Sequence, residues 1–303
     1  MRIPGQCMIL ESKWMSNEIL ERKLLIGLIG AGIQPSLSPS MHEAEARHHG
    51  IRLHYQLIDL DRSCVGVEAL PALLASARMM GFAGLNITYP CKQAVIPLLD
   101  ELSDEARAMG AVNSVVIRDG KMTGHNTDGP GWRWAFRRAM PQADLSHVVL
   151  LGAGGAGSAI AHAALALGVK KLIVVDRVPG KASELVAQLR CLYADRATTS
   201  SRLDDAIVGA SGLIHATPTG MRKLPGLPLP AELLRPSLWV AEVVYFPLET
   251  ELLRVARTLG CATLDGGGMA VGQAAAAFEI FTGIKPDVVR METHFHQLVE
   301  CPN

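Results

Sequence analysis

A glycine-rich segment in the middle of the chain offers the clearest chemistry in the sequence. It follows an apolar run typical of a buried strand and begins a stretch with helical spacing. Glycines in this G-x-G-x-x-G pattern allow a tight turn, the approach of a pyrophosphate to bare backbone, and close packing of helix on strand. The N-terminus of the helix then attracts the phosphates, so the pattern predicts a dinucleotide site. Its six residues are Gly152, Ala153, Gly154, Gly155, Ala156 and Gly157.

The residues that end the next apolar run bear on which dinucleotide binds. Asp176 lies roughly 20 residues downstream, where an acidic residue in such folds binds the adenosine ribose. A 2′-phosphate would meet a like charge there, which favours NAD. Arg177 follows immediately, and its guanidinium could instead neutralise a phosphate. We therefore expect NAD as the cofactor, with NADP as the less favoured alternative.

Four clusters of short polar residues in the first half of the chain predict a second ligand site. They lie at the ends of apolar runs, where open α/β sheets bind their ligands. Each cluster also has an ordinary interpretation, as a helix cap, a turn or an exposed helix start. The clusters are Ser36–Pro39, Asn86–Lys92, Gly110–Asn113 and Gly124–Gly129.

Short apolar runs alternate with longer stretches at helical spacing, which is typical of βα units and a largely parallel sheet. The first series predicts strands over 24–29, 53–60, 82–88 and 112–117, with helices over 40–49, 66–80, 93–99 and 103–109. A connecting helix over 131–139 leads to a second series, with strands over 147–151, 171–176, 212–216, 238–244 and 261–264 and a helix over 155–167. A last helix over 272–282, capped by Gly283, should pack back on the first domain.

The length of the chain and this pattern predict an α/β fold with two domains, because 303 residues exceed a single small core. We expect an N-terminal α/β substrate domain with a mostly parallel sheet, formed by residues 1–128 and 270–303. A Rossmann-type dinucleotide-binding domain should occupy residues 129–269.

Composition narrows the classes of partner. The 29 basic and 29 acidic residues balance, which argues against a nucleic-acid partner. Six scattered cysteines without C-x-x-C or zinc spacing predict reduced thiols in a cytoplasmic protein and no metal site. No run approaches the ~18 apolar residues that a membrane span needs. The N-terminus lacks a secretory pattern, and Met15 is an alternative start.

Taken together, the polar clusters resemble the motifs of the shikimate dehydrogenase family, in the order of that family. The family reads S-x-S-P, N-x-T-x-P-x-K, G-A-x-N and N-T-D-G, and this chain has the same letters at 36–39, 86–92, 110–113 and 126–129. Further matches are A-T-P at 216–218, V-V-Y-x-P at 243–247, D-G-x-G-M at 265–269 and F-T-G at 281–283. The resemblance covers the chain from Leu24 to Phe295.

The resemblance implies an NAD(P)-dependent oxidoreductase that interconverts shikimate and 3-dehydroshikimate. It places Lys92 and Asp128 at the reacting hydroxyl, whose proton must leave while hydride goes to the nicotinamide. A neighbouring carboxylate holds a lysine charged, so we expect Lys92 to donate to the ketone and Asp128 to orient it and share in proton transfer. The substrate-binding residues that it implies are Ser36, Ser38, Thr88, Asn113, Tyr245 and Gln273. Besides the glycine loop, Asp176 and Arg177, it implies cofactor contacts at Thr217, Val243 and Gly266.

Departures from the family pattern bear on the subfamily. Asp176-Arg177-Val178 replaces the Asn-Arg-Thr of many members that use NADP. The segments 30–35 and 41–45 look most similar to quinate/shikimate dehydrogenases that work with NAD. Gly272 stands where a larger residue often precedes Gln273, and we expect it to leave room in the pocket.

Several alternatives stay open at this point. Quinate dehydrogenase in a catabolic route is one, and an amino analogue of the substrate is another. A folate one-carbon dehydrogenase would lack the paired serines and the N-T-D-G block. An alternative from a different class of protein is a non-catalytic NAD-binding sensor. Such a sensor could lose Lys92 and Asp128, and the presence of both residues argues against it. A homodimer is an expectation from the family, and the direction of the reaction in the cell is open.

Overall fold

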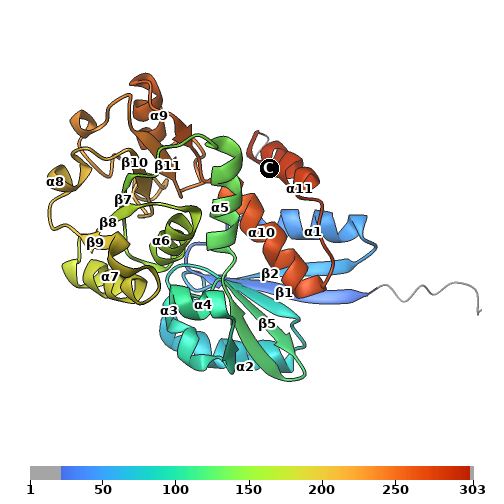
Figure 1. The fold of residues 1–303 in the computed structure, drawn as a ribbon. Helices are drawn as coiled ribbons and strands as arrows, with labels where there is room; N and C mark the ends of the chain where they lie inside the picture. The colour runs from blue at the N-terminus through green and yellow to red at the C-terminus, as the bar shows by residue number, and fades with distance from the viewer. Residues whose placement is uncertain (1–21, 301–303) are drawn as a thin grey trace, which may run out of the picture.

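The computed structural model describes residues 22–300 of the chain (Figure 1). The alternative start at Met15 and the thiols of Cys7 and Cys301 lie outside this range. The described chain forms two six-stranded sheets, with strand orders β2-β1-β3-β5-β6-β4 and β12-β11-β10-β7-β8-β9. The predicted α/β fold with two domains is confirmed, whereas the residue limits of the domains stay a prediction.

The first sheet is mixed. Its strands are β1 (Lys23–Gly30), β2 (Arg52–Asp59), β3 (Gly84–Ile87), β4 (Glu101–Leu102), β5 (Ser114–Arg118) and β6 (Lys121–His125). β1 pairs in parallel with β2 and β3, and β4 with β6, whereas β5 runs antiparallel to β3 and β6. Three of the five pairings are therefore parallel. The sequence analysis predicted neither β4 nor β6.

Helices cover both faces of this sheet because successive side chains of its strands point to opposite faces. The helices of this part are α1 (Ser38–His48), α2 (Leu70–Met79), α3 (Cys91–Ala94) and α4 (Asp104–Met109), with single 3₁₀ turns at Val67–Ala69 and Ile96–Leu98. Leu70 and Leu74 of α2 pack in one core cluster with Ile29 of β1. Ile26, on the other face of β1, packs with a later helix. The helix predicted over 93–99 is shorter, because a separate 3₁₀ turn that contains Pro97 begins at Ile96.

The second sheet is parallel throughout. Its strands are β7 (His147–Leu151), β8 (Lys171–Val175), β9 (Ala197–Thr199), β10 (Gly212–His215), β11 (Trp239–Glu242) and β12 (Thr263–Leu264). Its helices are α6 (Gly155–Leu167), α7 (Pro179–Tyr193), α8 (Leu203–Ile207) and α9 (Glu251–Thr258), with 3₁₀ turns at Ala194–Arg196 and Ala231–Leu233. The strand order reverses between β7 and β10, and such a switch point opens a crevice for a ligand.

Two helices run side by side between the sheets, α5 (Asp128–Ala139) and α10 (Gly267–Thr282) (Figure 1). Trp132 and Phe136 of α5 pack on the second sheet, whereas Ala277 and Phe281 of α10 pack on the first. The predicted return of this helix to the first domain is therefore confirmed. Gly283 caps it in the left-handed conformation, as predicted. The chain then continues into α11 (Val288–Glu300).

Glycines let α5 and α10 approach closely. A Cβ atom on Gly131 would lie 2.5 Å from the backbone N of Gln273, and one on Gly272 would lie 2.9 Å from the Cα of Gly131. The space beside Gly272 is thus filled by α5. Our expectation that this glycine leaves room in the pocket is wrong, because its small size serves the helix crossing. None of the helices within residues 22–300 is long and apolar enough to cross a membrane.

Candidate active site

The two predicted catalytic residues, Lys92 and Asp128, form an ion pair at the junction of the two halves of the molecule. Lys92 lies in α3, just beyond β3, and Asp128 is the first residue of α5. The Lys92 Nζ atom is 2.5 Å from Asp128 Oδ2, and their side chains are 17% and 5% exposed. The second carboxylate oxygen, Oδ1, accepts a hydrogen bond of 2.9 Å from Asn113 Nδ2. Both oxygens of the carboxylate are thus held in place.

The N-T-D-G block owes its order to a network around Asp128. Asn126 Oδ1 accepts the backbone N–H of Asp128 at 3.0 Å, and its Nδ2 donates to the carbonyl of Ala111 at 2.9 Å. Asn113 Oδ1 accepts the backbone N–H of Thr127, and Asn113 Nδ2 also donates to Thr127 Oγ1, both at 2.8 Å. Asn113 therefore positions Asp128. Its predicted contact with substrate stays a proposal.

Hydroxyl groups gather beside the ion pair. Burial raises the pKa of the Tyr245 hydroxyl, a hydrogen bond with Ser36 opposes this shift, and the negative charge of Asp128 adds to it. Burial also raises the pKa of Tyr55, against a hydrogen bond with Ser38. The structure thus brings the paired serines to two tyrosines near the Asp128 carboxylate. Such neutral donors suit a ligand rich in hydroxyls.

Tyr55 and Asn86 belong to this cluster, although the sequence analysis gave neither of them a role. The Tyr55 hydroxyl donates to Asn86 Oδ1 at 2.7 Å, and Asn86 Nδ2 donates to Ser114 Oγ at 3.0 Å. All three side chains are buried. The signal for Tyr55 is its place on the buried face of β2, which looks the same as that of an ordinary core residue.

The remaining predicted substrate residues come from two other elements. Thr88 directly follows β3, and its backbone N–H bonds to the carbonyl of Ile29 while its carbonyl accepts the N–H of Cys91. Gln273 lies in α10 where that helix touches Gly131, one turn from Asp128 in α5. Its Nε2 donates to the carbonyl of Ala270 at 3.1 Å. Both residues therefore lie on segments that adjoin the ion pair.

The glycine loop joins β7 to α6 and has the geometry that a dinucleotide needs. Gly152 has a φ of +102°, and a Cβ atom there would lie 2.6 Å from the carbonyl oxygen of Ala216. A Cβ atom on Gly157 would overlap the carbonyl oxygen of Gly152. A Cβ atom on Gly155 would lie 3.0 Å from Lys92 Cβ. Lys92 therefore packs directly on the loop, in which Gly154 is the N-cap of α6 and Ala156 lies in the first turn of that helix.

Asp176 follows β8 and faces the same loop. Its Oδ2 accepts the backbone N–H of Ala153 and its Oδ1 accepts that of Val178, both at 2.8 Å. Each oxygen keeps a lone pair with which to accept a ribose hydroxyl. Arg177, next to it, is exposed. The residues present thus fit an adenosine ribose at this end of the crevice.

The other predicted cofactor residues lie on the opposite side of the switch point. Thr217 and Val243 follow β10 and β11, and Gly266 immediately precedes α10. A Cβ atom on Gly266 would lie 2.5 Å from the carbonyl oxygen of Val243. Because Ala216 touches Gly152, these segments meet the glycine loop. The predicted cofactor residues therefore lie on segments that meet at the switch point of the second sheet.

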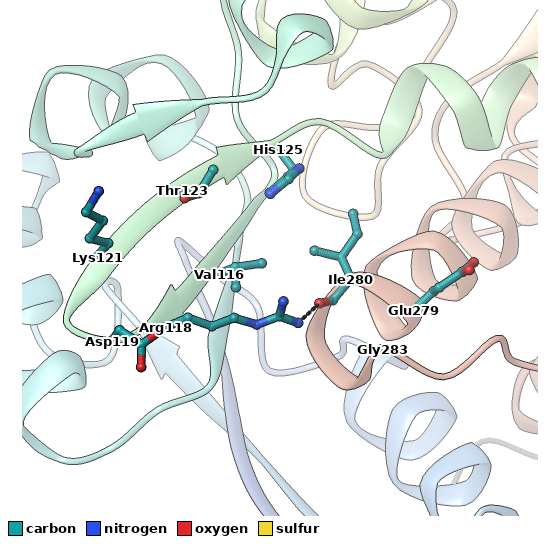
Figure 2. Close-up of a pocket in the computed structure, with 9 residues that line it drawn as sticks. All are labelled: Val116, Arg118, Asp119, Lys121, Thr123, His125, Glu279, Ile280 and Gly283. Atoms are coloured by element: carbon teal, nitrogen blue, oxygen red, sulfur yellow. Dashed lines mark hydrogen bonds between the residues drawn. The ribbon is translucent and has the colours of Figure 1, made fainter.

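A separate hollow lies between the β5–β6 hairpin and the C-terminal end of α10 (Figure 2). Its lining includes Arg118, Lys121, His125 and Glu279, and Arg118 crosses it to donate to the carbonyl of Ile280 at 3.0 Å. It contains none of the predicted site residues. Among residues 22–300, no group of three or more His, Cys, Asp or Glu side chains is placed to hold a metal ion.

Comparison with known proteins agrees with this arrangement. Residues 28–115 match the family model of the shikimate dehydrogenase substrate binding domain, and residues 266–293 match that of the shikimate 5'-dehydrogenase C-terminal domain. A shikimate dehydrogenase (NADP(+)) of Streptomyces avermitilis is 58% identical over 88% of this chain and 93% of its own. A quinate/shikimate dehydrogenase (NAD(+)) of Corynebacterium efficiens is 44% identical over 91% and 98%. The solved quinate dehydrogenase of Corynebacterium glutamicum in complex with NAD superimposes with a TM-score of 0.84, at 44% identity, over 92% of this chain and 100% of that one.

The fold and the comparisons define an NAD(P)-dependent oxidoreductase that acts on a CH–OH group, with the Lys92–Asp128 ion pair packed against the glycine loop of the second half. The chain belongs to the shikimate dehydrogenase family. The predicted family is therefore confirmed, and its members similar to this chain include proteins named for NAD and for NADP.

Proposed function

We propose that the protein interconverts shikimate and 3-dehydroshikimate and prefers NAD to NADP. The observation that carries this proposal is the packing of Lys92, paired with Asp128, directly on Gly155 of the dinucleotide loop. A hydride can only pass between substrate carbon and nicotinamide when the two groups lie in van der Waals contact. Lys92 packs on the loop and pairs with Asp128. It would therefore lie close to the place where the substrate carbon and the nicotinamide must meet.

Lys92 and Asp128 share the movement of the proton. When bound, the nicotinamide accepts the hydride from the carbon that bears the reacting hydroxyl, or returns it to the ketone. In the direction of reduction, Lys92 Nζ donates a hydrogen bond to the ketone oxygen and stabilises the negative charge that develops there. Asp128 orients Nζ and takes part in the relay that replaces the proton. In oxidation the same proton leaves by the reverse path.

Hydroxyl and amide groups hold the rest of the substrate in this proposal. Ser36, Ser38, Tyr245, Thr88, Asn113 and Gln273 would bind the carboxylate and ring hydroxyls. The hydrogen bonds between Tyr245 and Ser36 and between Tyr55 and Ser38, which the tyrosine oxygens accept, support this assignment, because they hold the serine side chains before the ligand arrives. Preorganised donors lose less entropy on binding.

The preference for NAD rests on Asp176. Its carboxylate lies at the end of β8, held by two backbone N–H groups, where a 2′-phosphate would bring a second negative charge close to it. The similarity to the quinate dehydrogenase of Corynebacterium glutamicum, solved with NAD, supports the same preference and favours quinate as a second substrate. Oxidation of quinate to 3-dehydroquinate is therefore our second candidate reaction.

An initial-rate matrix tests the proposal. Shikimate and quinate are each combined with NAD and NADP, and the nicotinamide absorbance is followed. We expect turnover with NAD and a higher kcat/KM for shikimate than for quinate. A higher kcat/KM for quinate would move the assignment to quinate oxidation, and a higher one for NADP would overturn the argument from Asp176. Tight NAD binding without turnover of either acid would favour a sensor.

A further inference from the structure

Two buried ionisable side chains, His215 and Glu242, lie side by side where β10 and β11 end, and none of the roles above uses them. The two residues are partners in the parallel register of these strands. His215 Nδ1 lies 2.8 Å from Glu242 Oε1 and 3.0 Å from Oε2, and both side chains are 0% exposed. Burying such a pair costs desolvation energy, so its presence calls for a gain elsewhere.

The Glu242 carboxylate fixes the backbone that follows β11. Its Oε1 accepts the backbone N–H groups of Val243 at 2.8 Å and Val244 at 3.0 Å. Its Oε2 accepts the hydroxyl of Thr250 at 3.0 Å, and Thr250 in turn caps α9. With His215 added, the carboxylate has four donors, which matches its capacity when ionised. Val243, one of the proposed cofactor residues, is thereby locked.

The His215 ring fixes the segment that follows β10. Since Nδ1 faces a carboxylate, it carries a ring proton, and Nε2 on the opposite side of the ring faces Thr217. Nε2 lies 2.5 Å from Thr217 Oγ1, which also accepts the backbone N–H of Thr219 at 3.3 Å. The Thr217 hydroxyl is thus held between two partners in one orientation.

The two locked segments lie at the end of the crevice that the nicotinamide must occupy. Asp176 on the β8 side marks the adenosine end, and β10 and β11 lie on the other side of the switch point. Gly152 of the loop touches Ala216, next to Thr217. Val243 touches Gly266, at the start of the helix that carries Gln273. The wall formed by Thr217 and Val243 therefore faces the region between the dinucleotide loop and the substrate pocket.

We propose that His215 and Glu242 form a buried positioning pair that holds Thr217 and Val243 as a rigid wall for the nicotinamide ring. This inference rests on the proposed function, because it requires a nicotinamide dinucleotide in the crevice. The pair does not touch the cofactor. It acts through the Thr217 hydroxyl and the backbone N–H groups of Val243 and Val244.

Calorimetric binding of NADH and of ADP-ribose tests the pair, because ADP-ribose contains every part of NADH except the nicotinamide. We expect His215→Gln to weaken NADH binding about tenfold, as the loss of one or two hydrogen bonds implies, and to change ADP-ribose binding less than about twofold. His162→Gln is the matched control. His162 of α6 is also buried in this half of the molecule, where it packs on Tyr193 of α7. The control substitution should change neither affinity.

The possible outcomes separate the two proposals. Equal weakening of NADH and ADP-ribose by His215→Gln would overturn the positioning role, since the pair would then support only the general fold. An unchanged affinity for NADH would also overturn it. If the unaltered protein bound neither NADH nor NADPH, the proposed function itself would fail, and the inference with it.

A second pair of variants leaves the buried residues in place and keeps the test open even if His215→Gln does not fold. Thr217→Val removes the hydroxyl that His215 holds, whereas Thr217→Ser keeps it. We expect Thr217→Val to weaken NADH binding about tenfold and Thr217→Ser to restore most of the affinity. In the His215→Gln background, Thr217→Val should add little further loss. Equal losses from both threonine variants, or additive losses in the double variant, would overturn the inference.

Discussion

At the scale of single residues, Lys92 and Asp128 are the pair that we propose for proton transfer. Lys92→Ala and Asp128→Asn should each lower kcat by roughly 10² to 10⁴, because each removes a group that moves or orients a proton in the transition state. Steady-state rates with NAD measure this loss. Lys121→Ala is the matched control, since Lys121 begins β6 with a side chain that is 69% exposed and pairs with Glu101 of β4. Losses below tenfold in both site variants would contradict the assignment.

Asp176 permits a second prediction, on the choice of dinucleotide. Asp176→Asn keeps the shape of the side chain and one oxygen that can accept a backbone N–H group. It removes the negative charge that opposes a 2′-phosphate. The ratio of kcat/KM for NADP to that for NAD should rise by about tenfold or more, as measured by initial rates at fixed shikimate. An unchanged ratio would show that the preference depends on another residue, with the neighbouring Arg177 as the first to test.

His42 gives a prediction about acid stability. Its ring is buried in α1 against Tyr55, Phe278 and Phe281, and burial lowers its pKa from 6.5 to about 4. The unfolded chain binds a proton at this histidine below pH 6.5 while the folded chain does not until about pH 4. The free energy of unfolding should therefore fall as the pH falls through this window, by about 2 kcal/mol at pH 5 from this residue alone.

Urea unfolding at pH 7.5 and pH 5 measures that contribution. His42→Phe should reduce the difference between the two pH values by about 2 kcal/mol, because the ring no longer takes up a proton on unfolding. His48→Gln, on the exposed side of the same helix, should leave the difference as it is. A pH dependence that His42→Phe does not alter would place the acid sensitivity at other groups, such as His162, whose pKa burial also lowers to about 4.

At the scale of elements, the crossing of α5 and α10 should tolerate no added atoms. Gly131→Ala would bring a methyl group within 2.5 Å of the Gln273 backbone N, and backbone cannot move as a side chain can. We expect a loss of about 1 to 3 kcal/mol in the free energy of unfolding. Gly180→Ala in α7 meets nothing within 4 Å and should instead leave stability unchanged or raise it by up to about 1 kcal/mol. Equal effects from the two substitutions would contradict this explanation.

Several of the strands predicted from the sequence are buried on both faces. β1, β7 and β10 read as continuous apolar runs because helices cover both sides of each sheet. β6 was missed because one face is open: Met122 and Gly124 are buried, while Lys121 is exposed and Thr123 and His125 are partly exposed. With Met122 as its one large apolar residue, the β6 sequence looks like that of a loop. The same open face leaves the hollow beside α10.

Only those residues of the candidate site that belong to a sequence motif could be predicted. Lys92, Asp128 and the glycine loop stand in recognisable patterns, and the structure brings them together. Tyr55 could not be found in this way, because a buried tyrosine in an alternating strand looks like core until its hydroxyl is seen on Asn86. His215 was missed for a similar reason, since its partner Glu242 is 27 residues away on the next strand.

At the scale of the whole molecule, Lys92 and the glycine loop belong to different halves, and they meet where helices join the two sheets. Lys92 comes from the first sheet and Gly155 from the second, while α5 and α10 lie between them. Trp132 and Phe136 attach α5 to the second sheet, and Asp128 begins the same helix at the substrate pocket. A change in the distance between the halves therefore alters the position of Lys92 relative to the dinucleotide loop.

Adding one methyl group between the halves tests this dependence. Gly155→Ala would place a Cβ atom 3.0 Å from Lys92 Cβ and 3.3 Å from its Cδ, so either the lysine or the loop must move by a few tenths of an ångström. A displacement of the proton donor relative to the hydride acceptor lowers kcat, and we expect a loss of about tenfold to a hundredfold.

Gly154→Ala is the control, because it adds the same methyl group to the same loop where nothing lies within 4 Å. Both variants add bulk near the phosphates and can raise the KM for NAD alike, but only Gly155→Ala should lower kcat at saturating NAD. Equal kcat values for the two variants would show that the approach of the two halves does not limit the reaction.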